Sequence, residues 1–153
     1  MKAEKDFEEF VKLLNEHEVL YLIVGAYAVG FHAEPRNTGD IDIWVEPTRK
    51  NAEKVMQVLE DFGFGDVNIS EKDILNPDMV IQLGYPPVRI DILSSITGVK
   101  FKGAFQSRVE GIFGATKAFF LSAKDLIKSK ESTGRIKDLA DAETLRKYLK
   151  AKE

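Results

Sequence analysis

The sequence predicts an α+β fold in which helices flank a small mixed β-sheet and a helical segment ends the chain. Short apolar runs bounded by glycine, proline or charged residues predict the strands. Apolar residues spaced three and four positions apart predict amphipathic helices around them. The chain has 153 residues, of which 44% are hydrophobic and 31% charged, so a buried core is attainable. We expect one domain over residues 1–153, with a core at about 18–121 and C-terminal helices at about 122–150.

The first half of the chain alternates predicted helices and strands. We expect a helix over 6–18, a buried strand over 19–25, a short helix over 26–33, a strand over 40–45 and a helix over 48–65. The last of these helices has Val55, Leu59 and Phe62 on one face, and Gly63 and Gly65 close it. The stretch 34–39 is a loop.

The second half has strands predicted at 78–84 and 88–94, joined by a turn at 85–87. We expect the stretch 99–122 to form short strands separated by glycine turns. Ser122 and Asp125 form a capping pattern that begins a helix. A final amphipathic helix over 135–150 has an apolar face of Ile136, Leu139, Leu145, Tyr148 and Leu149.

Composition excludes several classes of protein. There are no cysteines, so disulfides, zinc–thiolate sites and thiol nucleophiles are excluded. No apolar run approaches the roughly 18 residues of a membrane span, and the charged start of the chain is unlike a secretory signal. We therefore expect a cytoplasmic protein without a membrane partner. Residues 1–93 hold nine Lys and Arg against 18 Asp and Glu, whereas residues 94–153 hold 13 against seven. The basic second half either attracts phosphates or is a solvated helix surface.

Three aspartates within predicted strands are the main functional signal. Asp40 and Asp42 are two residues apart, so they share one face of their strand. Asp91 interrupts a second apolar strand. If the strands are neighbours, the three carboxylates converge, and Mg²⁺ prefers such oxygen ligands. Mn²⁺ would serve as well, and Asp91 could accept a proton from an attacking hydroxyl. The alternative is a solvent-exposed sheet face on which Arg89 neutralises a neighbouring aspartate.

A glycine turn precedes the acidic pair. An apolar strand ends at Gly25 and a helix begins, so free backbone N–H groups are presented to an anion such as a triphosphate. Arg36 and Thr38 lie in the loop just before the acidic pair, where Arg36 could contact phosphate oxygens. The Walker pattern, the Rossmann fingerprint and the GxSxG pattern of serine hydrolases are absent from the sequence.

These motifs resemble the nucleotidyltransferase superfamily, whose fold is polymerase-β-like. "VGA" at 24–26, "DIDI" at 40–43 and "RIDIL" at 89–93 match its glycine turn, its acidic pair and its third acidic residue. The run 21–45 and the tail 126–146 are similar to AbiEii-type and related minimal nucleotidyltransferases, which are often toxins of toxin–antitoxin pairs. The resemblance covers most of residues 20–147. It implies a nucleotidyltransferase-like mixed sheet flanked by helices.

The resemblance also implies roles for particular residues. Asp40, Asp42 and Asp91 would be the catalytic and metal-binding residues. The nucleotide would be bound by Gly25, Ala26, Arg36, Thr38 and Lys128. Lys128 resembles a lysine that the family directs at the phosphates, and Arg135, Lys137 and Asp138 resemble a recurring patch. Ala26 departs from the family pattern, which has glycine or serine at this position, and supplies no hydroxyl to a phosphate.

The expected reaction is Mg²⁺-dependent transfer of a nucleoside monophosphate from an NTP to an acceptor. An RNA end such as that of tRNA, a protein hydroxyl and a small molecule are all compatible acceptors, and an antitoxin protein would be a further partner. Ala26 motivates a second hypothesis, in which the chain is a catalytically inactive binding or regulatory module. The sequence predicts no oligomeric state.

Overall fold

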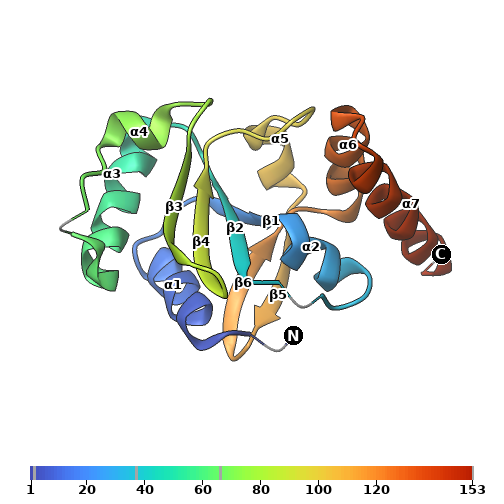
Figure 1. Cartoon of the computed structure of the whole chain (residues 1–153), viewed down its shortest axis with the longest axis horizontal. Coiled ribbons are helices and arrows are strands. Elements are labelled where there is room, and N and C mark those ends of the chain that lie inside the picture. Colours follow the sequence, from blue (N-terminus) through green and yellow to red (C-terminus); the bar gives the residue numbers. More distant parts are fainter. Residues whose placement is uncertain (2, 37, 66, 153) are drawn as a thin grey trace.

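Six strands form one mixed sheet in the computed structural model, which describes residues 1, 3–36, 38–65 and 67–152. The strands are β1 (Tyr21–Val24), β2 (Asp40–Val45), β3 (Val80–Tyr85), β4 (Val88–Leu93), β5 (Val109–Phe113) and β6 (Thr116–Phe120). Their order across the sheet is β3-β4-β2-β1-β6-β5. The pairs β2–β4 and β1–β6 are parallel, and the other pairs are antiparallel (Figure 1).

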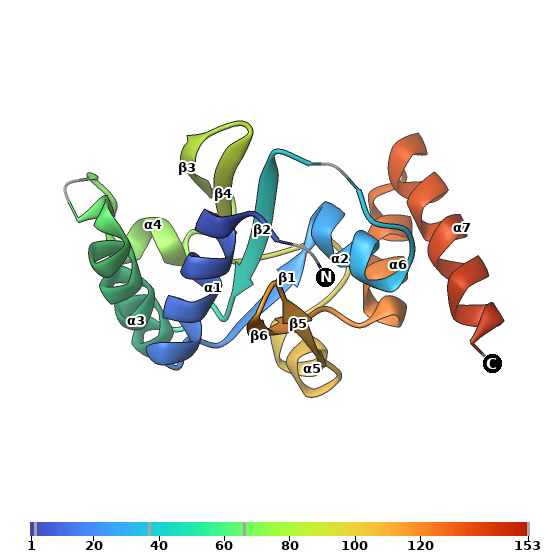
Figure 2. The same ribbon diagram turned by 90° about the horizontal axis from the view of Figure 1, so that it is seen from below.

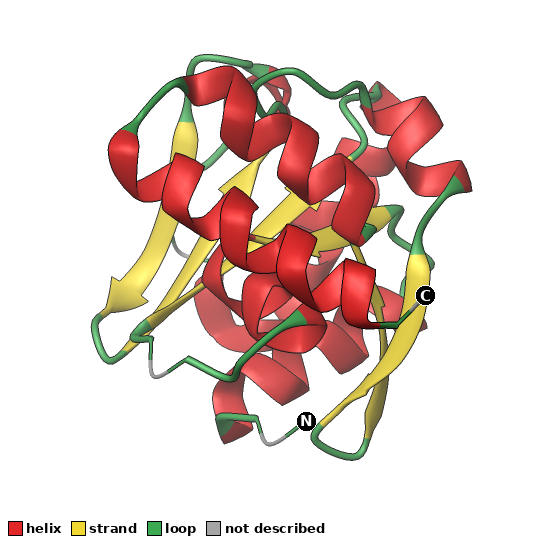
Figure 3. Ribbon diagram, turned by 90° about the vertical axis from the view of Figure 1, so that its right-hand side faces the viewer, coloured by secondary structure: helices red, strands yellow, loops and turns green. Residues whose placement is uncertain are grey.

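Helices flank this sheet at both ends. They are α1 (Lys5–Glu16), α2 (Gly25–His32), α3 (Arg49–Leu59), α4 (Glu71–Leu75), α5 (Phe101–Gln106), α6 (Ala123–Thr133) and α7 (Ile136–Ala151), with a π-helical segment η1 (Glu60–Phe64) after α3. Seen from below, α1 lies between α3 and the β5–β6 hairpin (Figure 2). At the C-terminal end of the molecule, α6 and α7 lie together in front of the sheet (Figure 3). No helix in the described part of the chain is long and apolar enough to cross a membrane.

One part of the buried core lies between the sheet and α1 and α3, and buried residues of α2, α5, α6 and α7 extend it. The apolar face of α1, which consists of Phe7, Phe10, Val11 and Leu14, is fully buried. Ile41, Ile43 and Val45 of β2 are also fully buried, as the alternation of this strand requires. The mixed sheet, its flanking helices and the helical C-terminal segment confirm the predicted α+β fold class.

The interpretation of residues 99–122 as short strands alone was incomplete. Residues 101–106 form α5, whose Phe101 packs edge-to-face on Trp44 with ring centroids 5.1 Å apart. Phe101, Ala104 and Phe105 have helical spacing, but Gly103 among them was interpreted as a turn residue, so the helix was not predicted. The rest of the stretch is the predicted strand pair, β5 and β6, joined through Gly114.

Two further helix predictions need correction. Helix α4 was not predicted, although Ser70 and Asp73 repeat the S-x-x-D pattern that located α6 and form a complete capping box. The predicted apolar face of α7 was wrong in its first two turns, because Ile136 is 87% exposed and Leu139 is 44% exposed. Asp138 and Asp141 are buried there instead. Ion pairs to neighbouring elements, rather than apolar contacts, hold this part of α7.

Candidate active site

The register of β2 and β4 brings the three predicted aspartates together. Asp42 lies opposite Asp91 in this parallel pair, and Asp40 lies opposite Arg89. One carboxylate oxygen from each aspartate lies within 4.8 Å of the others. Asp91 is buried, and Asp40 and Asp42 are half-buried at the edge of a cleft. The sequence pattern D-x-D on one strand and a single D on the next therefore does produce one cluster.

Arg89 pairs with this cluster. Its Nε donates to Asp91 Oδ1 at 2.9 Å, and its Nη2 donates to Asp91 Oδ2 at 3.0 Å. The same Nη2 lies 3.4 Å from Asp40 Oδ2. The neutralisation of an aspartate by Arg89, which the sequence left open, is therefore present together with the convergent cluster. Its planar guanidinium matches the two oxygens of Asp91.

Asp42 is the carboxylate with the least compensated charge. Burial is the largest cause that raises the pKa of Asp42, and together with the charges of the neighbouring Asp40 and Asp91 it brings the pKa to about 7, against the opposing effect of Arg89. A divalent cation would favour the ionised form of all three groups. The donor set, three carboxylates whose oxygens converge, is the kind that hard cations such as Mg²⁺ and Mn²⁺ take. These residues fit such a cation, which would polarise phosphate oxygens and offset their charge.

Gly25 allows the strand–helix turn to approach Asp42 closely. Its φ is +67°, and a Cβ atom built there would lie 2.0 Å from Asp42 Oδ2. Only glycine combines a left-handed φ with this lack of side-chain volume. The turn therefore brings the start of α2 directly against the acidic cluster.

Ala26 lies inside the first turn of α2, and the left-handed residue is Gly25 instead. The Cβ of Ala26 therefore causes no backbone strain, although the residue still lacks a hydroxyl. No side chain caps the N-terminus of α2, whose cap residue is Val24. The first N–H groups of this helix are thus available to an anion beside Asp42.

A cationic wall faces the acidic cluster, and it consists of Lys130 on α6, Arg135 at the N-cap of α7 and Arg36 in the loop after α2. Lys130 Nζ lies 3.2 Å from Asp138 Oδ1 and 3.1 Å from Asp141 Oδ2. Arg135 Nε donates to Asp138 Oδ2 at 2.7 Å, and Arg36 forms an ion pair with Asp141. The three cations outnumber the two aspartates that hold them, so this wall keeps a positive excess.

A cleft separates the acidic cluster from the cationic wall. One part, of about 320 Å³, is lined by Gly25, Ala26, Arg36, Thr38, Asp40, Asp42, Lys130, Arg135, Lys137, Asp138 and Asp141. An adjoining part of about 290 Å³ shares Gly25, Asp42, Lys130, Arg135 and Asp138 with it. The cleft thus combines carboxylates for a metal with amides and cations for phosphates.

The nucleotide-binding residues predicted from the sequence lie in different places. Gly25, Ala26, Arg36 and Thr38 line the cleft, and Thr38 Oγ1 donates to Asp40 Oδ1 at 3.0 Å. Lys128 is exposed and lines neither part of the cleft. The lysine of α6 that does line it is Lys130, which the sequence reasoning missed. Placing Ser122 as the N-cap and following the buried side of α6 past Ile127 would have favoured Lys130.

A family model described as "Nucleotidyltransferase of unknown function (DUF6036)" matches residues 3–149. No functionally curated protein matches the sequence.

Solved structures share the fold at low identity. The lincosamide antibiotic adenylyltransferase LnuA, in its lincomycin-bound structure, is 19% identical with a TM-score of 0.56, and the match covers 94% of this chain and 96% of that chain. A candidate nucleotidyltransferase from Thermotoga maritima is 17% identical with a TM-score of 0.58, over 95% and 91% of the two chains. An antigenic nucleotidyltransferase-like protein from Paracoccidioides brasiliensis is 12% identical with a TM-score of 0.51, over 97% and 78%. These likenesses confirm the nucleotidyltransferase-like fold.

Proposed function

Because the chain belongs to the DUF6036 family of nucleotidyltransferases, we propose that it transfers a nucleoside monophosphate from an NTP to an acceptor hydroxyl. In this proposal Asp40, Asp42 and Asp91 hold Mg²⁺, with Mn²⁺ as a substitute. We also propose that residues 1–153 form one domain and that the whole of it serves this reaction.

The observation that carries the proposal is the pairing of an acidic cluster with a cationic wall across one cleft. Convergent oxygens of Asp40, Asp42 and Asp91 suit a divalent cation, and Lys130 and Arg135 face them. A metal-bound triphosphate needs both groups, because the metal ion requires carboxylate ligands and the remaining phosphate oxygens require positive charge. A structural aspartate cluster on a solvated sheet face would not need the second wall.

Each group has a defined part in the proposed reaction. The N-terminus of α2, beginning at Gly25 and Ala26, binds phosphate oxygens through its backbone N–H groups. Lys130 and Arg135 offset the remaining charge of the β- and γ-phosphates. A divalent cation held by Asp40, Asp42 and Asp91 would neutralise charge at the α-phosphate, which is attacked in the transfer. The buried Asp91, held in one orientation by Arg89, is suited to accept the proton of the attacking hydroxyl.

The acceptor that we favour is a small molecule. LnuA, which shares this fold, is a lincosamide antibiotic adenylyltransferase, and its structure is bound to lincomycin. A tRNA end and a protein hydroxyl are the other acceptors that the sequence left open. The toxin role and the antitoxin partner implied by the AbiEii-type resemblance stay predictions, as does a cytoplasmic location. Growth arrest on induced expression, lost in Asp42→Asn, would support the toxin role.

Calorimetric titration of the four NTPs with Mg²⁺ tests the proposal. We expect metal-dependent binding by the wild type and its loss, by about 100-fold or more, in Asp42→Asn. Asparagine keeps the volume of Asp42 and removes the charge that burial already opposes, so the fold should persist. Asp78→Asn, in an exposed turn, is the matched control and should bind as the wild type does. Equal binding by Asp42→Asn and the wild type would refute the assignment.

The inactive-module hypothesis has one observation in its favour. Arg89 already occupies Asp91 and touches Asp40, so the cluster is partly neutralised without a metal. A module of this kind would bind an NTP equally with and without Mg²⁺. The calorimetric titration therefore separates the two functions.

A further inference from the structure

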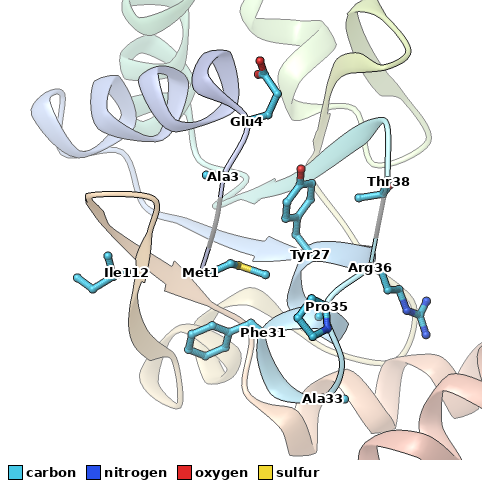
Figure 4. A pocket seen from close by; sticks show the side chains of 11 residues that line it. Met1, Ala3, Glu4, Tyr27, Phe31, Ala33, Pro35, Arg36, Thr38 and Ile112 are labelled. Atoms are coloured by element: carbon cyan, nitrogen blue, oxygen red, sulfur yellow. The ribbon is translucent and has the colours of Figure 1, made fainter.

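A cavity of about 920 Å³ lies beside the cleft, between the N-terminal segment, α2, the loop after it and β5 (Figure 4). Its apolar side is made by Met1, Phe31, Pro35 and Ile112, among others. This volume lies within the range of pockets that bind small organic molecules. The proposed reaction of the cleft does not use this cavity.

The cavity and the cleft share Arg36 and Thr38 as a common boundary. Thr38 Oγ1 donates to Asp40 Oδ1, so the residue that lines the cavity at this boundary is in direct contact with the acidic cluster. A molecule bound in the cavity would therefore present its nearest edge to the carboxylates. This is the position that an acceptor of the nucleotidyl group requires.

The cavity is lined by a carboxylate that forms no ion pair with the described residues, unlike the aspartates of the cationic wall. Glu4 is the carboxylate that lines it, and no ion pair within the described part of the chain includes Glu4. Arg36 is directed away from the cavity, toward Asp141 (Figure 4). The cavity therefore offers one carboxylate, Glu4, with which a bound cation can pair.

Glu4 is fixed by the helix that it caps. Its Oε2 accepts hydrogen bonds from the backbone N–H groups of Asp6 at 2.7 Å and Phe7 at 3.2 Å. These two bonds order the carboxylate before any ligand arrives, so little side-chain entropy is lost when a cation pairs with it.

Tyr27 supplies a neutral polar group at the same end of the cavity. Its ring packs edge-to-face on Phe7 and Phe113, with centroids 5.7 and 5.4 Å away. Figure 4 shows its hydroxyl directed toward the end that bears Glu4. Burial raises the pKa of Tyr27, and Glu4 and Asp40 raise it further, so the hydroxyl stays protonated and can donate to an acceptor oxygen.

We propose that this cavity binds the acceptor, a small amphipathic molecule with an apolar body, a positively charged amine and a free hydroxyl. The amine pairs with Glu4, the apolar body contacts Phe31 and Ile112, and the hydroxyl lies toward Thr38 and Asp40. The identification of this ligand as the acceptor rests on the proposed function. In the transfer, the hydroxyl oxygen forms a bond to the α-phosphorus, the bond from that phosphorus to the bridging oxygen breaks, and pyrophosphate leaves. The hydroxyl proton passes through the carboxylate cluster to solvent.

A charge series with one apolar body tests the cavity. Phenylethanolamine, styrene glycol and mandelate share a phenyl ring and a hydroxyl and differ in carrying a positive, no or a negative charge. We would titrate each into the whole chain and follow the methyl signals of Met1, Ala33 and Ile112 by NMR. Met56 and Ile69, which line a separate cavity near η1, report on non-specific binding. The expected order of affinity is amine, then glycol, then mandelate.

Glu4→Gln is the informative variant, because glutamine keeps an oxygen for the helix cap and loses the charge. It should weaken phenylethanolamine about fivefold, as expected for one partly exposed ion pair, and leave styrene glycol unchanged. Glu9→Gln, on the exposed side of α1, is the matched control. Equal affinities across the series, or amine binding unaffected by Glu4→Gln, would overturn the proposal. A preference for mandelate would overturn it in favour of a phosphate-bearing acceptor such as an RNA end.

The same sample distinguishes this proposal from the proposed function. Titration with each of the four NTPs and Mg²⁺ should, for at least one of them, shift the methyl signal of Ala26, which lies in the cleft, and leave Ile112 in place. An amine response at Ile112 without a response to any NTP at Ala26 would refute nucleotide transfer and support the cavity as a binding site. The reverse result would refute the cavity proposal alone.

Discussion

Arg89 and Asp91, two residues apart on β4, form a bidentate ion pair in the middle of the acidic cluster. A cation that binds Asp91 competes with this guanidinium for the same oxygens. We therefore expect Arg89→Met to raise the affinity for Mg²⁺ and Mn²⁺ about tenfold, or about 1.4 kcal/mol. Calorimetry without nucleotide measures this change directly.

The same substitution should weaken the metal-free fold. Without Arg89, the three carboxylates repel one another, so the melting temperature should fall and added Mn²⁺ should restore it. Arg49→Met is the control, since the side chain of Arg49 is 83% exposed and its ion pairs are long. If Arg89→Met binds metal no better than the wild type, Arg89 does not compete with the cation.

Gly25→Ala should disrupt both the turn and the acidic cluster. The new Cβ would lie 2.0 Å from Asp42 Oδ2, at a φ of +67°. Strain and overpacking together should lower the free energy of unfolding by about 2 to 4 kcal/mol. Gly103→Ala in α5 is the matched control, because its Cβ would meet nothing within 4 Å. That variant should be stabilised by up to about 1 kcal/mol in urea unfolding, by helix propensity. A Gly25→Ala protein as stable as the wild type would contradict the close approach.

Lys130 and Lys128 offer a comparison within one helix. Lys130 faces the acidic cluster across the cleft, whereas Lys128 is exposed outside it. We expect Lys130→Met to weaken MgATP binding about tenfold, as loss of one charge-assisted contact would, and Lys128→Met to leave it unchanged. Calorimetric titration of the two variants, after circular dichroism has confirmed their folds, gives the answer. A larger loss of MgATP affinity in Lys128→Met than in Lys130→Met would show that Lys128 contacts the phosphates, as the sequence resemblance indicated.

The strands of the sheet and the acidic residues on them could be predicted from the sequence, because strand alternation is a short-range rule. Strand alternation places Asp40 and Asp42 on one face, and Asp91 interrupts a second apolar strand, but the sequence leaves open whether the two strands are neighbours. The structure brings all three together. The position of Gly25 before a helix likewise follows from local backbone chemistry.

The cationic wall could not be predicted from the sequence in this way. The pairing of Arg36 with Asp141 joins residues 105 positions apart, and no local pattern reports it. The faces of a helix are predicted from the spacing of its apolar residues, and α7 departs from this rule. Its packed side carries the buried Asp138, whereas Ile136 and Leu139 are exposed. A tertiary ion-pair network decides the orientation of this helix.

Asp138 should give the stability of the protein a measurable dependence on acid pH. Burial alone would raise its pKa, but hydrogen bonds from Thr133, Arg135 and Lys130 outweigh burial and lower the pKa from 3.8 to about 2. Because the folded-state pKa lies below the unfolded value, ionised Asp138 contributes its full stabilisation above about pH 4. That contribution is lost as the pH falls from about 4 through about 2.

Urea unfolding of the wild type and Asp138→Asn near neutral pH and at about pH 3 tests this linkage. Asparagine keeps the volume of Asp138 and cannot ionise, so it lacks the pH-dependent contribution. The difference in unfolding free energy between the two proteins should therefore shrink on acidification. Asp78→Asn, in the exposed turn before β3, should follow the wild type at both pH values. A difference that stays constant would mean that the partners of Asp138 hold its protonated form as well as its ionised form, and Lys130 would then owe its position to packing rather than to charge.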